Sequence, residues 1–152
     1  MTYLLDTNIV VFLVRGLKVY VNPSEPQRAL HKVARRIFDR AQNEKLAGNQ
    51  VALSAITVAE LEFGACNSGD YEREIDSARR AMTPFALHAF DPEHCAAHYG
   101  KVRYALESTG KAIGSLDTLI AAHALALGAT LVTNDTTEFS RVKGLNCEDW
   151  AV

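Results

Sequence analysis

The sequence has 152 residues, of which 48% are hydrophobic and 22% charged, and its formal net charge is −2. This length fits one domain with a sizeable core, and the composition excludes an intrinsically disordered chain. The longest purely apolar stretch, residues 9–14, is far shorter than the roughly 20 residues that a membrane span requires. Because the net charge is close to zero, binding to a nucleic acid would depend on positive residues that are gathered locally.

The start of the chain and its cysteines both indicate an intracellular compartment. The chain begins MTYLLD, so an acid stands where the apolar run of a secretory signal would begin. The three cysteines, Cys66, Cys95 and Cys147, are widely separated and form no C-x-x-C pair, which favours buried thiols over metal ligands. We therefore expect a cytoplasmic protein that does not contact a membrane.

Strand and helix patterns alternate along the chain. An apolar strand over residues 3–5 precedes a short helix over 9–14, and helical periodicity covers residues 27–46 after a proline-containing loop. A strand over 51–53 leads into a helix that is capped by Ser54 and stops at Gly64. The later pattern predicts a helix over 71–82, a strand over 85–90 and helices over 91–110 and 115–127. Two strands, over 129–133 and 147–150, follow.

This alternation predicts an α/β fold in which a central, mainly parallel sheet has helices on both faces. No repeat or linker divides the sequence, so we expect residues 1–152 to form a single domain. Ligands of such sheets bind outside the carboxyl ends of the strands, where the strand order reverses. Acids that closely follow strands are therefore candidate site residues.

Four acids have this placement: Asp6, Glu60, Asp117 and Asp135. Each also fits an ordinary structural role. Asp6 can cap a helix, Asp117 can complement a helix dipole, and Glu60 and Asp135 belong to capping-box-like patterns. These roles explain the set less well when taken together, because Glu60 falls too late in its helix to cap it if Ser54 is the cap.

Carboxylates that converge on one place repel one another, and at least one takes up a proton unless a cation neutralises the group. Magnesium prefers oxygen ligands and uses one or two protein carboxylates directly. No cluster of cysteine and histidine indicates zinc. The pattern therefore favours magnesium or manganese chemistry on a phosphate ester.

The chain resembles PIN-domain proteins of the VapC toxin type, the ribonuclease half of a toxin–antitoxin pair. The matching segments are LLDTN at residues 4–8, SAITVAELEFG at 54–64, IGSLDTLIAAHA at 113–124, LVTND at 131–135 and FSRVKGL at 139–145. Each segment is weakly specific, whereas the ordered set spans most of the chain. Residues 17–48 do not match the family pattern closely, so the surface that binds substrate is less well defined than the chemistry.

The resemblance implies a PIN-like three-layer α/β/α sandwich and a magnesium-dependent endoribonuclease, with Mn²⁺ as the other suitable metal. It implies that Asp6, Glu60, Asp117 and Asp135 are the catalytic acids and that Asp6, Asp117 and Asp135 hold the metal. Thr7, Asn8 and Thr133 match positions that orient those acids by hydrogen bonding. The implied partners are an RNA substrate, a small cognate antitoxin and a second copy of the chain in a homodimer.

Positive residues gather between Arg28 and Lys45. On a helical wheel, Arg28, Lys32, Arg35 and Arg36 share one side. This side is either an ordinary solvated face, which we favour, or a track for RNA.

Three other functions are alternatives to that of a toxin nuclease. One is a PIN-like nuclease with a non-toxin role in RNA processing, and another is a binding module without nuclease activity. A phospho-acceptor domain usually has two adjacent acids after its first strand, whereas here Thr7 follows Asp6.

Overall fold

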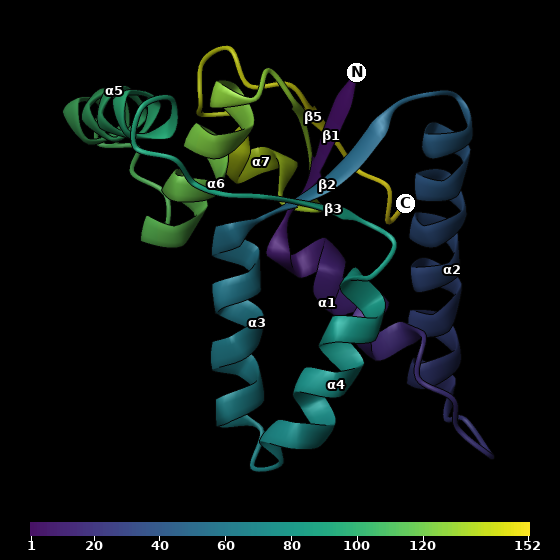
Figure 1. The fold of residues 1–152 in the computed structure, drawn as a ribbon. Helices are drawn as coiled ribbons and strands as arrows, with labels where there is room; N and C mark the ends of the chain where they lie inside the picture. Colours follow the sequence, from purple (N-terminus) through teal and green to yellow (C-terminus); the bar gives the residue numbers. More distant parts are fainter.

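The structure, a computed structural model, describes residues 1–152. Five parallel strands form its central sheet in the order β3-β2-β1-β4-β5 (Figure 1). The strands are β1 (Thr2–Leu5), β2 (Gln50–Ser54), β3 (Ala86–His88), β4 (Thr130–Val132) and β5 (Cys147–Glu148). Because β1 pairs with both β2 and β4, the strand order reverses beside β1, which is where ligands of such sheets bind.

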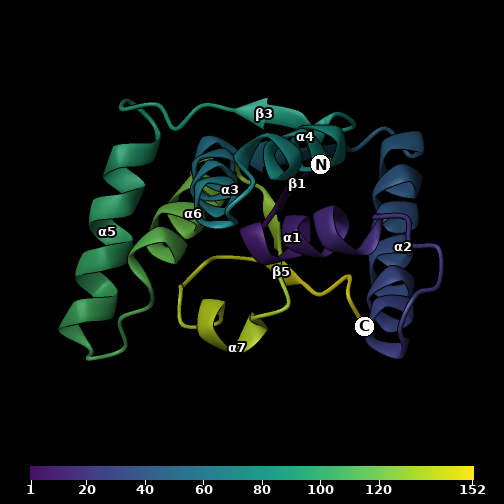
Figure 2. The same ribbon diagram turned by 90° about the horizontal axis from the view of Figure 1, so that it is seen from below.

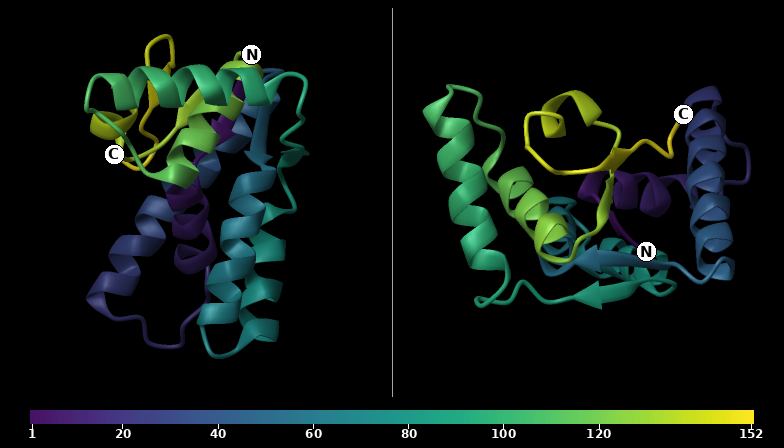
Figure 3. Two further views of the ribbon diagram at one scale, coloured as in Figure 1. Left: turned by 90° about the vertical axis from the view of Figure 1, so that its left-hand side faces the viewer. Right: turned by 90° about the horizontal axis from the view of Figure 1, so that it is seen from above.

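Seven helices cover the two faces of the sheet. They are α1 (Thr7–Gly16), α2 (Glu25–Leu46), α3 (Ala55–Asn67), α4 (Tyr71–Met82), α5 (Cys95–Ser108), α6 (Ser115–Ala126) and α7 (Thr136–Phe139). Figures 2 and 3 show α2 and α5 at opposite sides of the molecule, with the sheet between them. The predicted three-layer α/β/α arrangement is therefore confirmed.

Alternating side chains of each strand supply two separate cores, because successive residues of a strand point to opposite faces. Tyr3 and Leu5 of β1 pack with the buried residues of α1 to α4. Leu4, which lies between them, packs with those of α5 to α7. The central strands β2, β1 and β4 are largely buried on both faces, and their buried residues are mostly apolar.

Several predicted boundaries differ from the structure. The helix expected to stop at Gly64 continues to Asn67, since Ala65 in its last turn is buried in the core. The helix expected from residue 91 begins at Cys95, after a turn in which Asp91 accepts a hydrogen bond from His94 N at 2.8 Å. The short helix α7 was not predicted.

No helix combines the length and the apolar character that crossing a bilayer would take. Cys95 is buried and Cys147 half-buried, whereas Cys66 is exposed on α3. The prediction of buried thiols is therefore wrong for Cys66.

Candidate active site

Asp6 lies at the end of the central strand, with a carboxylate that is buried and held by two donors. Its side chain is 3% exposed. Oδ1 accepts a hydrogen bond from Thr7 N at 2.7 Å, which caps α1, and Oδ2 accepts one from Thr133 Oγ1 at 2.9 Å. Burial raises the pKa of Asp6, the two hydrogen bonds oppose this, and the charges of Glu60 and Asp135 add to it. Asp6 therefore caps a helix and also belongs to an acidic cluster.

Glu60 is carried to this cluster by α3 and is oriented by threonine hydroxyls. Ser54 caps α3 through a hydrogen bond from Ile56 N at 3.0 Å, so Glu60 has no capping role. The Thr7 hydroxyl donates to Glu60 Oε2. Since this bond uses the hydrogen of Thr7, the buried Thr57 hydroxyl, 3.1 Å away, is the donor to Thr7. Two hydroxyl groups in series thus hold the Glu60 carboxylate.

Asp117 lies in the first turn of α6 and has the most strongly shifted pKa of the cluster. Burial and then the charges of neighbouring acids raise its pKa to about 6. Those neighbours are, in decreasing order of effect, Asp6, Glu138, Glu60 and Asp135. The structure therefore brings all four predicted acids into one electrostatic environment.

Asp135 follows β4 and begins the short helix α7. Its Oδ1 accepts a hydrogen bond from Glu138 N at 3.1 Å, as a helix cap does, and its own backbone N–H donates to Thr133 Oγ1 at 3.0 Å. Thr133 therefore bridges two of the acids, donating to Asp6 and accepting from Asp135. The role of Thr133 in orienting metal ligands stays a prediction.

Glu138 is a fifth acid that the sequence did not identify as part of the site. Its spacing from Asp135 predicts a reciprocal capping box, but Thr133 already occupies the backbone N–H of Asp135. The Glu138 side chain instead reaches the start of α6 and accepts a hydrogen bond from Gly114 N at 3.2 Å. Among the acids, only Asp6 raises the pKa of Asp117 more.

Two other predicted features lie outside this network. The Asn8 side chain is exposed and makes no hydrogen bond, so its role in orienting the acids stays a prediction. Three cations of α2 pair on the helix itself: Arg28 with Glu25, Arg35 with Asp39 and Arg40 with Glu44. Arg36 instead donates to the backbone oxygen of Ala151. Helices α2 and α6 lie on opposite sides of α1 (Figure 2), and the choice between a solvated face and a track for RNA stays a prediction.

The donor set fits a hard divalent cation. It consists of carboxylate oxygens, and their mutual repulsion is expressed in the raised pKa of Asp117. The side chains share one environment without converging into a ready-made group of three ligands. Asp6 is the most constrained acid, because protein donors reach both of its oxygens.

Comparisons with known proteins agree with this geometry. Residues 3–145 match the PIN domain family. The chain is 35% identical to "Ribonuclease VapC1" of Haemophilus influenzae, over 99% of this chain and 98% of that protein. It is 31% identical to "tRNA(fMet)-specific endonuclease VapC" of Shigella flexneri, over 98% of each chain.

A solved structure is also similar to nearly the whole chain. It is that of VapBC2 of Rickettsia felis bound to a DNA fragment from its promoter, and it matches with a TM-score of 0.81 and 31% identity over 99% of both chains. The family match, the curated relatives and this structure all span nearly the whole chain. The chain therefore belongs to the VapC group of the PIN-domain family.

Proposed function

We propose that this protein is the toxin of a type II toxin–antitoxin pair and that it acts as a metal-dependent endoribonuclease. The observation that carries the proposal is the hydrogen-bond network in which Thr7 and Thr133 link Asp6, Glu60 and Asp135 beside the end of β1. Burial and the charges of these acids and of Glu138 also raise the pKa of Asp117 to about 6. A cluster of carboxylates beside the point where the strand order reverses is suited to a divalent cation, and the cation in turn can bind a phosphate ester. The ribonuclease names of relatives at 31% and 35% identity support RNA as the substrate.

In this proposal Asp6, Asp117 and Asp135 hold Mg²⁺ or Mn²⁺. A divalent ion held by these acids would supply an activated water and would offset the charge of the phosphate. Glu60, held by Thr7 and Thr57, orients the water that attacks phosphorus. The bond from phosphorus to the 3′ oxygen breaks, that oxygen takes up a proton, and the new ends are a 3′-hydroxyl and a 5′-phosphate.

The direct experiment compares the purified wild type with Asp6→Asn on defined RNAs in the presence of Mg²⁺ or Mn²⁺. Transfer RNA is included because of the Shigella flexneri relative. Cleavage by the wild type alone, abolished by a chelator, is the expected result. If both proteins leave every RNA intact, or cut equally, the nuclease proposal is wrong. Growth arrest after induced expression then distinguishes a toxin from an RNA-processing enzyme.

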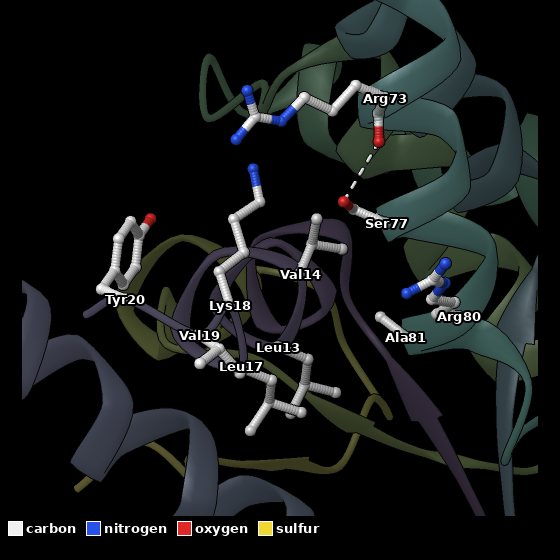
Figure 4. Close-up of a pocket in the computed structure, with 10 residues that line it drawn as sticks. All are labelled: Leu13, Val14, Leu17, Lys18, Val19, Tyr20, Arg73, Ser77, Arg80 and Ala81. Atoms are coloured by element: carbon white, nitrogen blue, oxygen red, sulfur yellow. Dashed lines mark hydrogen bonds between the residues drawn. The ribbon is translucent and has the colours of Figure 1, made fainter.

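A groove beside α1 supplies a surface for the antitoxin. Its floor is apolar and its rim carries the cations Lys18, Arg73 and Arg80 (Figure 4). Lys18 and Arg80 form ion pairs with acids of α4, whereas Arg73 forms none. The floor consists of Leu13, Val14, Leu17 and Ala81. Val14 also lines the adjoining pocket that contains Thr7 and Glu60. We infer that an apolar segment with acidic residues lies in this groove and extends towards the acids.

The antitoxin is tested by co-purification with the product of the adjacent gene. Val19 lines the groove and is 97% exposed, so Val19→Asp should weaken the complex without disturbing the fold. Tyr104→Asp on α5 is the matched control, since that side chain is exposed and remote from the groove. Equal retention of the antitoxin by both variants would contradict this placement. Light scattering of the free toxin tests the expected homodimer.

A further inference from the structure

A buried hydrogen bond joins the two helices that carry Glu60 and Asp117. His123 of α6 is fully buried, and its Nδ1 lies 2.8 Å from the hydroxyl oxygen of Ser54. Ser54 is also fully buried, and it is the cap of α3. The bond therefore connects the C-terminal half of α6 with the first turn of α3.

The hydrogen-bonding partners of Ser54 leave its hydroxyl hydrogen available for this bond. The Ser54 oxygen accepts a hydrogen bond from Ile56 N at 3.0 Å, and its hydroxyl hydrogen has no other acceptor. Donation of this hydrogen to His123 Nδ1 corresponds to the ring tautomer that carries its proton on Nε2. The Ser54 side chain thus caps the start of α3 and also binds α6.

The surroundings of the ring agree with a neutral imidazole. Burial is the largest influence on His123, and it lowers the pKa, as does the nearby His88. Nε2 makes no well-formed hydrogen bond, and the charge of Asp91 and the backbone of Ala89 oppose the lowering of the pKa more weakly than burial and His88 produce it. The ring packs edge-on against Phe90, with 5.5 Å between centroids, and against His88, at 6.5 Å. Only Nδ1 makes a hydrogen bond, so the polar function of this buried side chain is directed at Ser54.

The bond lies the same number of residues away from Glu60 on one helix as from Asp117 on the other. Six residues separate Ser54 from Glu60, and six separate Asp117 from His123. At a rise of about 1.5 Å per residue, both acids lie roughly 9 Å along their helices from the bond. The charge of Glu60 acts on Asp117, so the two acids lie on the same side of this connection. A shift of α6 along α3 would change their separation.

We propose that His123 is a positioning residue, which acts through Ser54 to fix α6 against α3 and thereby sets the spacing of Asp117 and Glu60. This inference rests on the proposed metal-dependent function. It assigns His123 a role beyond filling space in the core. Glu60 and Asp117 repel each other as like charges, and the bond between Ser54 and His123 holds their two helices together.

Two amide substitutions of similar size separate positioning from packing. Asparagine can place its side-chain oxygen near the site of Nδ1, where it can accept from Ser54, whereas glutamine places its amide near the site of Nε2. We expect His123→Asn to bind Mn²⁺ nearly as tightly as the wild type. We expect His123→Gln to bind about tenfold more weakly, within the range found when residues that support metal ligands are changed. Mn²⁺ affinity is measured by titration calorimetry, beside urea unfolding of each variant.

A second arm tests the bond itself. Ser54→Ala removes the bond to His123 and also the cap of α3, so it should weaken Mn²⁺ binding at least as much as His123→Gln does. The double variant should bind no more weakly than Ser54→Ala alone, because the bond to His123 is then already lost. The nitrogen NMR shifts of His123 should show a proton on Nε2 alone. If His123→Gln does not fold, Ser54→Ala carries the test.

The outcomes distinguish this inference from the proposed function. A wild type that binds Mn²⁺ and cuts RNA, with His123→Gln and Ser54→Ala unchanged in Mn²⁺ affinity, overturns the positioning role alone. It is also overturned if the Asn and Gln variants lose Mn²⁺ affinity equally and the loss is proportional to their loss in free energy of unfolding. A wild type that binds Mn²⁺ without cutting RNA overturns the nuclease proposal and leaves the positioning test intact. A wild type that binds no Mn²⁺ overturns both.

Discussion

The Thr133 hydroxyl donates a hydrogen bond to Asp6 Oδ2 across a distance of 2.9 Å. The two residues directly follow β4 and β1, which are neighbours in the sheet. The direction of the bond is fixed, because Thr133 Oγ1 accepts from Asp135 N at 3.0 Å and has one hydrogen left to donate. Thr133 thus determines how a buried carboxylate presents its oxygens.

Thr133→Val should weaken metal binding by about 10- to 100-fold, because it removes this donor from Asp6 while keeping the shape of the side chain. Without the donor, the ionised form of Asp6 is less stable, and its pKa rises further. Thr133→Ser keeps the hydroxyl and serves as the matched control. Mn²⁺ affinity and the rate of RNA cleavage should fall together in the valine variant only. Unchanged affinity in Thr133→Val would show that the bond does not support a metal ligand.

The sequence predicted the sheet and most helices because their signals are local. The apolar runs of β1, β2 and β4 and the periodicity of α2, α4 and α6 can each be recognised without the rest of the fold. The acids Asp6 and Asp135 were found because parallel strands end at one edge of a sheet. The extension of α3 past Gly64 was missed, since burial of Ala65 depends on tertiary packing.

The position of the Glu138 side chain could not be predicted from the local sequence pattern. The pattern from Asp135 to Glu138 predicts a capping box, and the half formed by Asp135 is present. The other half is absent because Thr133, which precedes the pattern, takes the backbone N–H of Asp135. Only the placement of α7 beside the start of α6 reveals where the Glu138 side chain goes. The bond between His123 and Ser54 likewise joins residues 69 positions apart.

The metal-free protein should show a pH dependence of stability that comes from Asp117. Its folded-state pKa of about 6 lies above the ordinary aspartate value of 3.8, so the folded state binds this proton more readily. The contribution is fully present below about pH 4 and is lost as the pH rises through about 6. Stability of the wild type relative to Asp117→Asn should therefore increase when the pH is lowered from 7.5 to 5.

The comparison with Asp117→Asn is needed because His123 acts in the opposite direction. Burial lowers its folded-state pKa, so protonation in the unfolded state costs stability as the pH falls below 6.5. Urea unfolding in a chelator at several pH values measures both proteins. A constant difference between them would contradict the raised pKa of Asp117. Saturating Mg²⁺ should abolish the trend, since the ion replaces the proton.

Gly16 should be essential for the packing of α1 on α2. A Cβ at this position would contact the Cβ of Ala34 and lie 2.7 Å from the Leu30 carbonyl oxygen. Gly16→Ala should therefore lower the free energy of unfolding by about 1–3 kcal/mol. Gly64→Ala is the contrasting control, because nothing lies within 4 Å of its Cβ and the position is inside α3. It should raise stability by roughly 0.5–1 kcal/mol. Equal effects in urea unfolding would contradict the close approach.

Glu138→Gln should weaken Mn²⁺ binding several-fold although the residue is not among the predicted ligands. Its carboxylate accepts from Gly114 N at 3.2 Å, and its charge acts on Asp117 more strongly than that of Glu60 or Asp135. Removing the charge reduces the attraction of the site for a cation, and it lowers the pKa of Asp117. Glutamine keeps an oxygen for Gly114, so the fold should persist. Glu72→Gln, an exposed change on α4, is the control for net charge. If the two variants bind Mn²⁺ equally well, Glu138 only connects α7 to Gly114 at the start of α6; a selective loss shows that its charge contributes to the metal site.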